Sequence, residues 1–166
     1  MNIWMSRQLC GSPAAEESSL HMQIRHVRSR SPRHGRRQQL KRTVLDANII
    51  LRYLLNDNAQ LAAQAEEMVR SENAAVTIEV MAEVVYVLKG VYQVERQMIA
   101  HALLEFLKEV PATEPEVLKK GLQIYAVHSL DFVDCILYAY QQVMDWEIRT
   151  FDRKLQKLLQ QPEPEI

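Results

Sequence analysis

The chain has 166 residues, of which 48% are hydrophobic and 25% charged, which is the composition of an ordinary globular protein with room for one domain and its core. Its two cysteines have no signal-peptide core around them, and no apolar stretch could span a membrane, so we expect a cytoplasmic protein without disulfides. Nine Lys and Arg against two acidic residues give residues 1–42 a charge of +7, whereas eleven against nineteen give residues 43–166 a charge of −8.

Residues 1–42 form a basic N-terminal extension. They show no helical or strand periodicity, and residues 25–42 are rich in Arg, Ser and His, so disorder is predicted. Three interpretations stay open: a tail translated from a misassigned start, an arm that grips nucleic-acid phosphates, and a targeting segment. We expect one folded domain over 43–160 and a short tail over 161–166.

A dense hydrophobic pattern starts at Thr43. A short strand leads to Asp46 and then to a helix, and Asn58 is placed to cap a second helix that runs to about residue 70. A brief strand over 75–77 follows. Residues 79–92 are apolar almost all round, which predicts a buried helix.

The second half of the chain continues the alternation of predicted helices and strands. It predicts a helix over 95–108, a strand over 110–112, and a helix to about 127 opened by a capping box of Thr113 and Glu116. Ser129 is then placed to cap a helix over 130–144, before a strand over 147–150 and a final helix over 153–159. Short strands between helices, without hairpin signals, predict an α/β fold: a three-layer α/β/α domain with a short parallel sheet flanked by helices. The carboxyl ends of parallel strands meet at one edge of such a sheet.

Acidic residues occupy unusual places in this pattern. Asp46 and Asp152 each follow a strand, where a helix N-cap alone would explain them. Glu83 lies within the most apolar helix without a basic neighbour, so it is expected to be buried and to need a partner. Asp131 and Asp134 share a helix face, again without Lys or Arg within a turn, and two such charges repel each other unless a cation lies between them.

Taken together, these carboxylates favour a divalent metal site. Mg²⁺ and Mn²⁺ prefer oxygen ligands, and phosphodiester hydrolysis uses such ions to activate water and offset phosphate charge. Zinc is disfavoured because His101 and His128 form no ligand pair with a cysteine. Cys135 is interpreted as a small core residue and His128 as a surface residue.

Four motifs, in order, resemble those of the PIN domain family, and specifically of VapC-type toxins of type II toxin–antitoxin pairs. They are TVLDAN at residues 43–48, Thr77 with MAEVVYVL at 81–88, LDFVD at 130–134, and TFDR at 150–153. The resemblance runs from about residue 43 to about residue 159.

This resemblance implies a PIN fold and a Mg²⁺- or Mn²⁺-dependent endoribonuclease that works as a homodimer and is inhibited by a small antitoxin. The family's catalytic and metal-binding acids fall on Asp46, Glu83, Asp134 and Asp152, with Asp131 as an additional acid that touches the metal through water. Its supporting polar residues fall on Asn48 and Thr150. Because the domain is acidic, RNA needs local cations, and the candidates near the motifs are Arg52, Lys89, Arg149, Arg153 and Lys154, each of which could equally be a solvated surface charge. Two alternatives remain: a non-toxin PIN nuclease in RNA processing, and a catalytically silent PIN-like binding module.

Overall fold

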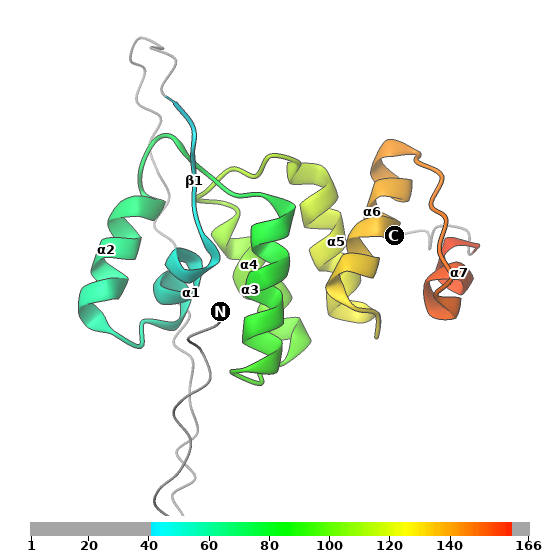
Figure 1. The fold of residues 1–166 in the computed structure, drawn as a ribbon, viewed down its shortest axis with the longest axis horizontal. Coiled ribbons are helices and arrows are strands. Elements are labelled where there is room, and N and C mark those ends of the chain that lie inside the picture. Colours follow the sequence, from blue (N-terminus) through cyan, green and yellow to red (C-terminus); the bar gives the residue numbers. More distant parts are fainter. Residues whose placement is uncertain (1–40, 161–166) are drawn as a thin grey trace, which may run out of the picture.

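The computed structural model describes residues 41–160 and has a short parallel sheet at its start (Figure 1). Strand β1 (Thr43–Val44) pairs with β2 (Ala74–Ala75), with Thr43 opposite Ala74 and Val44 opposite Ala75. An isolated parallel bridge pairs Val76, just after β2, with Ala112. The predictions for residues 1–40 and 161–166 fall outside the described residues.

Seven helices make up most of residues 41–160. They are α1 (Ala47–Leu55), α2 (Ala59–Val69), α3 (Ile78–Gly90), α4 (Arg96–Phe106), α5 (Pro115–Val127), α6 (Phe132–Met144) and α7 (Arg153–Leu159). The predicted class is confirmed: an α/β domain in which helices flank a short parallel sheet. None of these helices is long and apolar enough to cross a membrane.

Helices α2 and α3 begin at side-chain caps; the sequence predicts the cap at Asn58 but places Thr77 at the end of a strand. The Asn58 side chain accepts a hydrogen bond from the Leu61 amide at 3.1 Å and so begins α2. Thr77 does the same for α3, accepting from the Val80 amide at 3.4 Å.

The other two predicted caps are wrong. The Thr113 amide donates to the Val76 carbonyl and so holds Thr113 beside β2, and α5 has Glu114 at its N-cap and begins at Pro115. Proline suits this first helical position because it has no amide to leave unpaired. Helix α6 likewise begins after Asp131 rather than after Ser129.

The sheet is smaller than the sequence predicts. Of the expected strand over 110–112 only the bridge at Ala112 forms, and the expected strand over 147–150 has no partner and is not a strand. Propensity alone does not make a strand, because its backbone groups need a neighbour.

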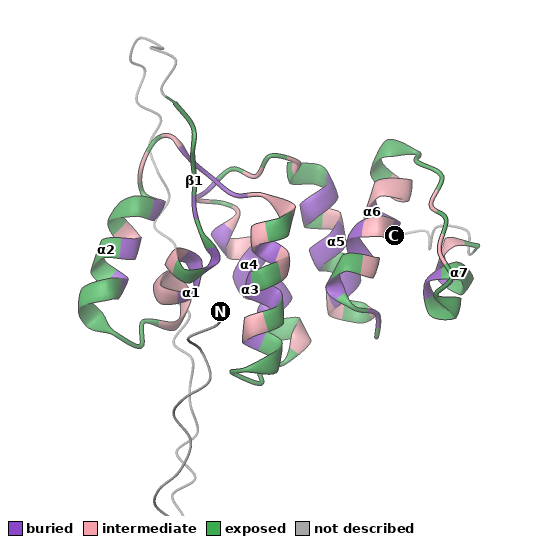
Figure 2. Cartoon of the chain, viewed as in Figure 1, coloured by how far each residue is buried: buried purple, intermediate pink, exposed green. Residues whose placement is uncertain are grey.

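A single core joins these elements, and it holds buried residues from β2 and all seven helices (Figure 2). Helix α5 packs closely on α4 and α6, helix α1 on α2 and α3, and α6 also contacts α3 and α7. At the α5–α6 contact, a Cβ on Gly121 would lie 2.4 Å from Ile136 Cδ1, so the absence of a side chain there permits the close approach. The helices that carry the candidate acids, α1, α3, α6 and α7, are thus linked by successive contacts.

Candidate functional site

Asp46 occupies the N-cap position of α1 without acting as a cap. Its side chain makes no capping hydrogen bond and is exposed, and its Oδ2 instead accepts a hydrogen bond of 3.2 Å from Asn48 Nδ2. Helix capping therefore does not account for this carboxylate, and the Asn48 side chain holds it in place.

Asp152 differs from Asp46 because it does cap its helix. Its Oδ1 accepts hydrogen bonds from the Lys154 and Leu155 amides, both at 2.8 Å, at the start of α7. The Asp152 amide in turn donates to Thr150 Oγ1 at 3.0 Å. These bonds fix the direction of the carboxylate, so the two predicted supporting residues, Asn48 and Thr150, each contact the acid two positions away.

Glu83 is exposed, which corrects the expectation that it is buried. Helix α3 is not enclosed on all sides: it buries Met81, Val84, Val85 and Leu88 on one face and leaves Tyr86 76% exposed on the other. A water-exposed carboxylate costs little, so burial does not oblige Glu83 to bind a cation.

The two aspartates near the start of α6, Asp131 and Asp134, both lie close to other charged side chains. Asp131 stands at the N-cap without a capping bond and pairs with Lys89 of α3, Nζ to Oδ1 at 3.2 Å, so a cation that the local sequence lacks comes from another helix. Asp134 is half-buried in the first turn, and burial raises the pKa of its carboxyl, as do the nearby charges of Asp152 and then Asp131.

A hard divalent ion fits this set of groups in donor chemistry and charge. All the candidate ligands offer carboxylate oxygens, and a cation would relieve the repulsion that Asp134 experiences from Asp152 and Asp131. No three His, Cys, Asp or Glu side chains within residues 41–160 are grouped closely enough to hold an ion as they stand. The structure thus places Asp134 near Asp152 and Asp131, whereas Asp46 and Glu83 make no direct contact with them.

Most of the candidate RNA-binding cations are already paired. Arg52 binds Asp57 with 2.5 Å between Nη1 and Oδ2, and this pair raises the pKa of the Arg52 guanidinium. Arg149 Nε lies 3.1 Å from Glu147 Oε1. These are surface pairs, which contribute little to stability and can exchange for a phosphate. Arg153 and Lys154 are exposed beside Asp152.

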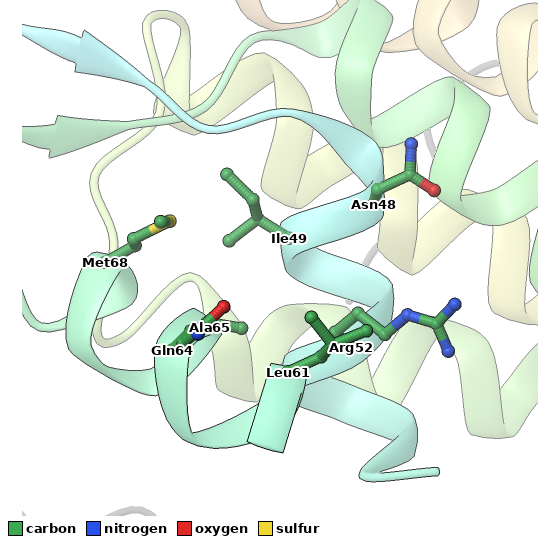
Figure 3. A pocket seen from close by; sticks show the side chains of 7 residues that line it. All are labelled: Asn48, Ile49, Arg52, Leu61, Gln64, Ala65 and Met68. Atoms are coloured by element: carbon green, nitrogen blue, oxygen red, sulfur yellow. The ribbon is translucent and has the colours of Figure 1, made fainter. Parts of the chain in front are cut away.

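A groove of about 260 Å³ runs between α1 and α2 (Figure 3). Helix α1 contributes the supporting residue Asn48 and the candidate cation Arg52 on successive turns, with Ile49 between them. Helix α2 contributes the facing wall, formed by Leu61, Gln64, Ala65 and Met68.

Arg96 is a positioning residue that no sequence pattern indicates. Its guanidinium donates to the carbonyls of Tyr125 at 2.6 Å, Leu130 at 2.7 Å and His128, and lies 4.1 Å from the centre of the Tyr125 ring. It thereby holds the segment between α5 and α6, which ends directly before the N-cap residue Asp131.

Cys135 is buried, as predicted, and burial raises the pKa of its thiol to about 12. Such a thiol stays protonated at neutral pH, so it is a core residue rather than a nucleophile.

The family model described as the PIN domain matches residues 43–159 of this chain. No curated protein and no solved structure matches it significantly.

Proposed function

Because this chain belongs to the PIN domain family, whose members are generally nucleases, we propose that it is a divalent-metal-dependent endoribonuclease. The observation that carries the proposal is that the exposed carboxylate of Asp46 lies at a helix start without capping the helix. The repulsion at Asp134 adds a second reason for a cation.

In this proposal Asp46, Glu83, Asp134 and Asp152 hold the ion, with Asp131 as an outer ligand. When bound, Mg²⁺ or Mn²⁺ supplies positive charge at the phosphate and makes a water molecule more acidic. Asn48 keeps Asp46 in place, and the α7 amides do the same for Asp152. Arg149, Arg153 and Lys154 supply positive charge beside Asp152, where an RNA strand would meet an otherwise acidic domain.

The test is RNA cleavage by the full chain. The protein should cut RNA with Mn²⁺ and stop when EDTA is added, and Asp46→Asn should reduce cleavage to background. Glu67→Gln, which removes an exposed acid of α2, is the matched control and should cut like the wild type. Cleavage that survives Asp46→Asn, or that continues in EDTA, would overturn the assignment.

We also propose that the enzyme is the toxin of a VapC-type pair and acts as a homodimer, which the four motifs support by resemblance. Expression in a bacterial host should arrest growth, a neighbouring small gene should relieve the arrest, and Asp46→Asn should be harmless. Light scattering should give the mass of two chains. RNA cleavage without growth arrest would favour an RNA-processing nuclease instead, and RNA binding without cleavage would favour a silent binding module.

A further inference from the structure

The Arg96 side chain holds the backbone that leads into the acidic first turn of α6. Arg96 lies at the start of α4, which packs on α5, and α5 packs on α6 (Figure 1). Its Nη1 donates to the carbonyls of Tyr125, at 2.6 Å, and His128, and its Nη2 donates to that of Leu130 at 2.7 Å. One guanidinium therefore holds the end of α5 and the residue directly before Asp131.

The residue that follows Asp131 is held through an aromatic contact. Phe132 is the first residue of α6 and is buried, and its ring lies edge-on to the Tyr125 ring with 5.7 Å between the centroids. The Arg96 guanidinium lies 4.1 Å from the centre of the same Tyr125 ring. Both kinds of contact depend on geometry, so the two neighbours of Asp131 in the chain are both tied to Arg96.

The carboxylates of this turn have little support of their own. The Asp131 side chain makes no capping hydrogen bond, and its pair with Lys89 is largely exposed. Asp134, in the first turn of α6, lies near the charges of Asp152 and Asp131. Because an ion needs its ligands held close together in spite of this repulsion, the backbone of the turn has to be fixed.

We propose that Arg96 is a positioning residue for the divalent ion: it keeps α6 where the Asp131 and Asp134 carboxylates can share that ion with Asp152. Arg96 lies outside the four acidic motifs and acts only through the residues that it holds. The inference rests on the proposed nuclease function and adds a residue to its site. The sign of the effect separates this role from electrostatics, because the positive charge of Arg96 alone would weaken the binding of a second cation.

The experiment measures Mn²⁺ binding without RNA. MnCl₂ is titrated into the full chain by isothermal titration calorimetry, well below the Tm of every variant. Arg96→Met should raise the Kd for Mn²⁺ by about tenfold, as is typical for the loss of a residue that orients metal ligands. Arg96→Lys keeps the charge but cannot bond all three carbonyls, so it should raise Kd by about threefold. The Lys variant also carries the test if the Met variant does not fold.

Val69→Ala is the matched control. It shortens a fully buried side chain of α2, a helix that carries none of the candidate acids, so it lowers Tm and leaves the contacts of Arg96 in place. Its Kd for Mn²⁺ should stay within about twofold of the wild type.

A double-mutant cycle tests whether Arg96 acts through the acids of α6. In the Asp134→Asn background, Arg96→Lys should have a smaller effect on the Kd for Mn²⁺ than it has in the wild type, because one of the carboxylates that Arg96 positions is already gone. Equal effects in the two backgrounds would overturn the proposed route.

The outcomes separate this inference from the proposed function. An unchanged or lowered Kd in the Arg96 variants, or an equal rise in Val69→Ala, would overturn the positioning role while Mn²⁺-dependent cleavage can still stand. If the Arg96 variants weaken Mn²⁺ binding but the wild type cuts no RNA, the positioning role stands and the nuclease assignment fails. A wild type that binds no Mn²⁺ would overturn both.

Discussion

At the scale of single residues, Asp46 and Asp152 both occupy helix N-cap positions, but only the Asp152 side chain caps its helix. The Asp152 carboxylate receives two backbone amide hydrogen bonds, whereas that of Asp46 receives none from the backbone of its helix. We therefore predict that Asp152→Ala lowers the free energy of unfolding by about 1 kcal/mol and that Asp46→Ala changes it by only a few tenths. Urea denaturation measures both. Asp152→Asn, which can still cap, should restore the stability; equal losses at the two positions would contradict this division of roles.

Asp134 predicts a pH dependence with a defined sign. Its pKa is raised by burial and by Asp152 and Asp131, so the folded state takes up this proton more readily than the unfolded chain does. The stabilisation from this group is fully present below the ordinary aspartate pKa of about 4 and is lost as the pH rises through the raised value.

Asp134→Asn, which mimics the protonated form, should therefore raise Tm at pH 7 by about 2 °C, because a like-charge pair one helical turn apart costs a few tenths of a kcal/mol. Melts from pH 3 to pH 8 should show this advantage disappearing near pH 4. An advantage that grows as the pH falls would refute the assignment.

At the scale of elements, Arg96 joins α4 to the segment that precedes α6. Replacing it with Met keeps an apolar stem but leaves three carbonyls without their donor and removes the contact with the Tyr125 ring. We predict a loss of about 2–4 kcal/mol in the free energy of unfolding and faster amide exchange over residues 128–131. Arg96→Lys should be intermediate, since one ammonium cannot reach all three carbonyls.

Lys119→Met is the control for the Arg96 variants. Lys119 forms only a surface pair with Glu116, at 3.3 Å between Nζ and Oε1, so its loss should cost less than about 0.5 kcal/mol. If Arg96→Met and Lys119→Met lowered the free energy of unfolding by similar amounts, the three carbonyl contacts of Arg96 would not stabilise the fold as predicted.

The sequence predicts those elements whose signals are local. Asn58 caps α2 from three residues away, and residues 153–159 form the expected last helix. The misplaced features depend on distant partners: Thr113 is held by Val76, and the segment before α6 is held by Arg96. Residues 147–150 favour a strand but find no neighbour to pair with.

The same distinction applies to the candidate site. Asp134 lies in the first turn of α6 because this helix begins at Phe132, two residues later than predicted. The positions of Asp46 and Asp152 at helix starts follow from the sequence. The exposure of Glu83 does not, since it depends on which face of α3 the neighbouring helices leave open. Lys89 meets Asp131 only across two helices, so no local pattern could have paired them.

At the scale of the whole molecule, the acidic domain should be stabilised by the ion it is proposed to bind. Residues 43–166 carry a net charge of −8, and a ligand that binds only the folded state stabilises it in proportion to the logarithm of its concentration. We predict that Mn²⁺ raises Tm progressively, corresponding to about 2.7 kcal/mol at one hundred times its Kd. Asp46→Asn should shift this titration to higher concentrations, whereas Glu67→Gln should leave it unchanged. An equal response of all three proteins would mean that Mn²⁺ only screens surface charge, and no response would favour a silent binding module over a nuclease.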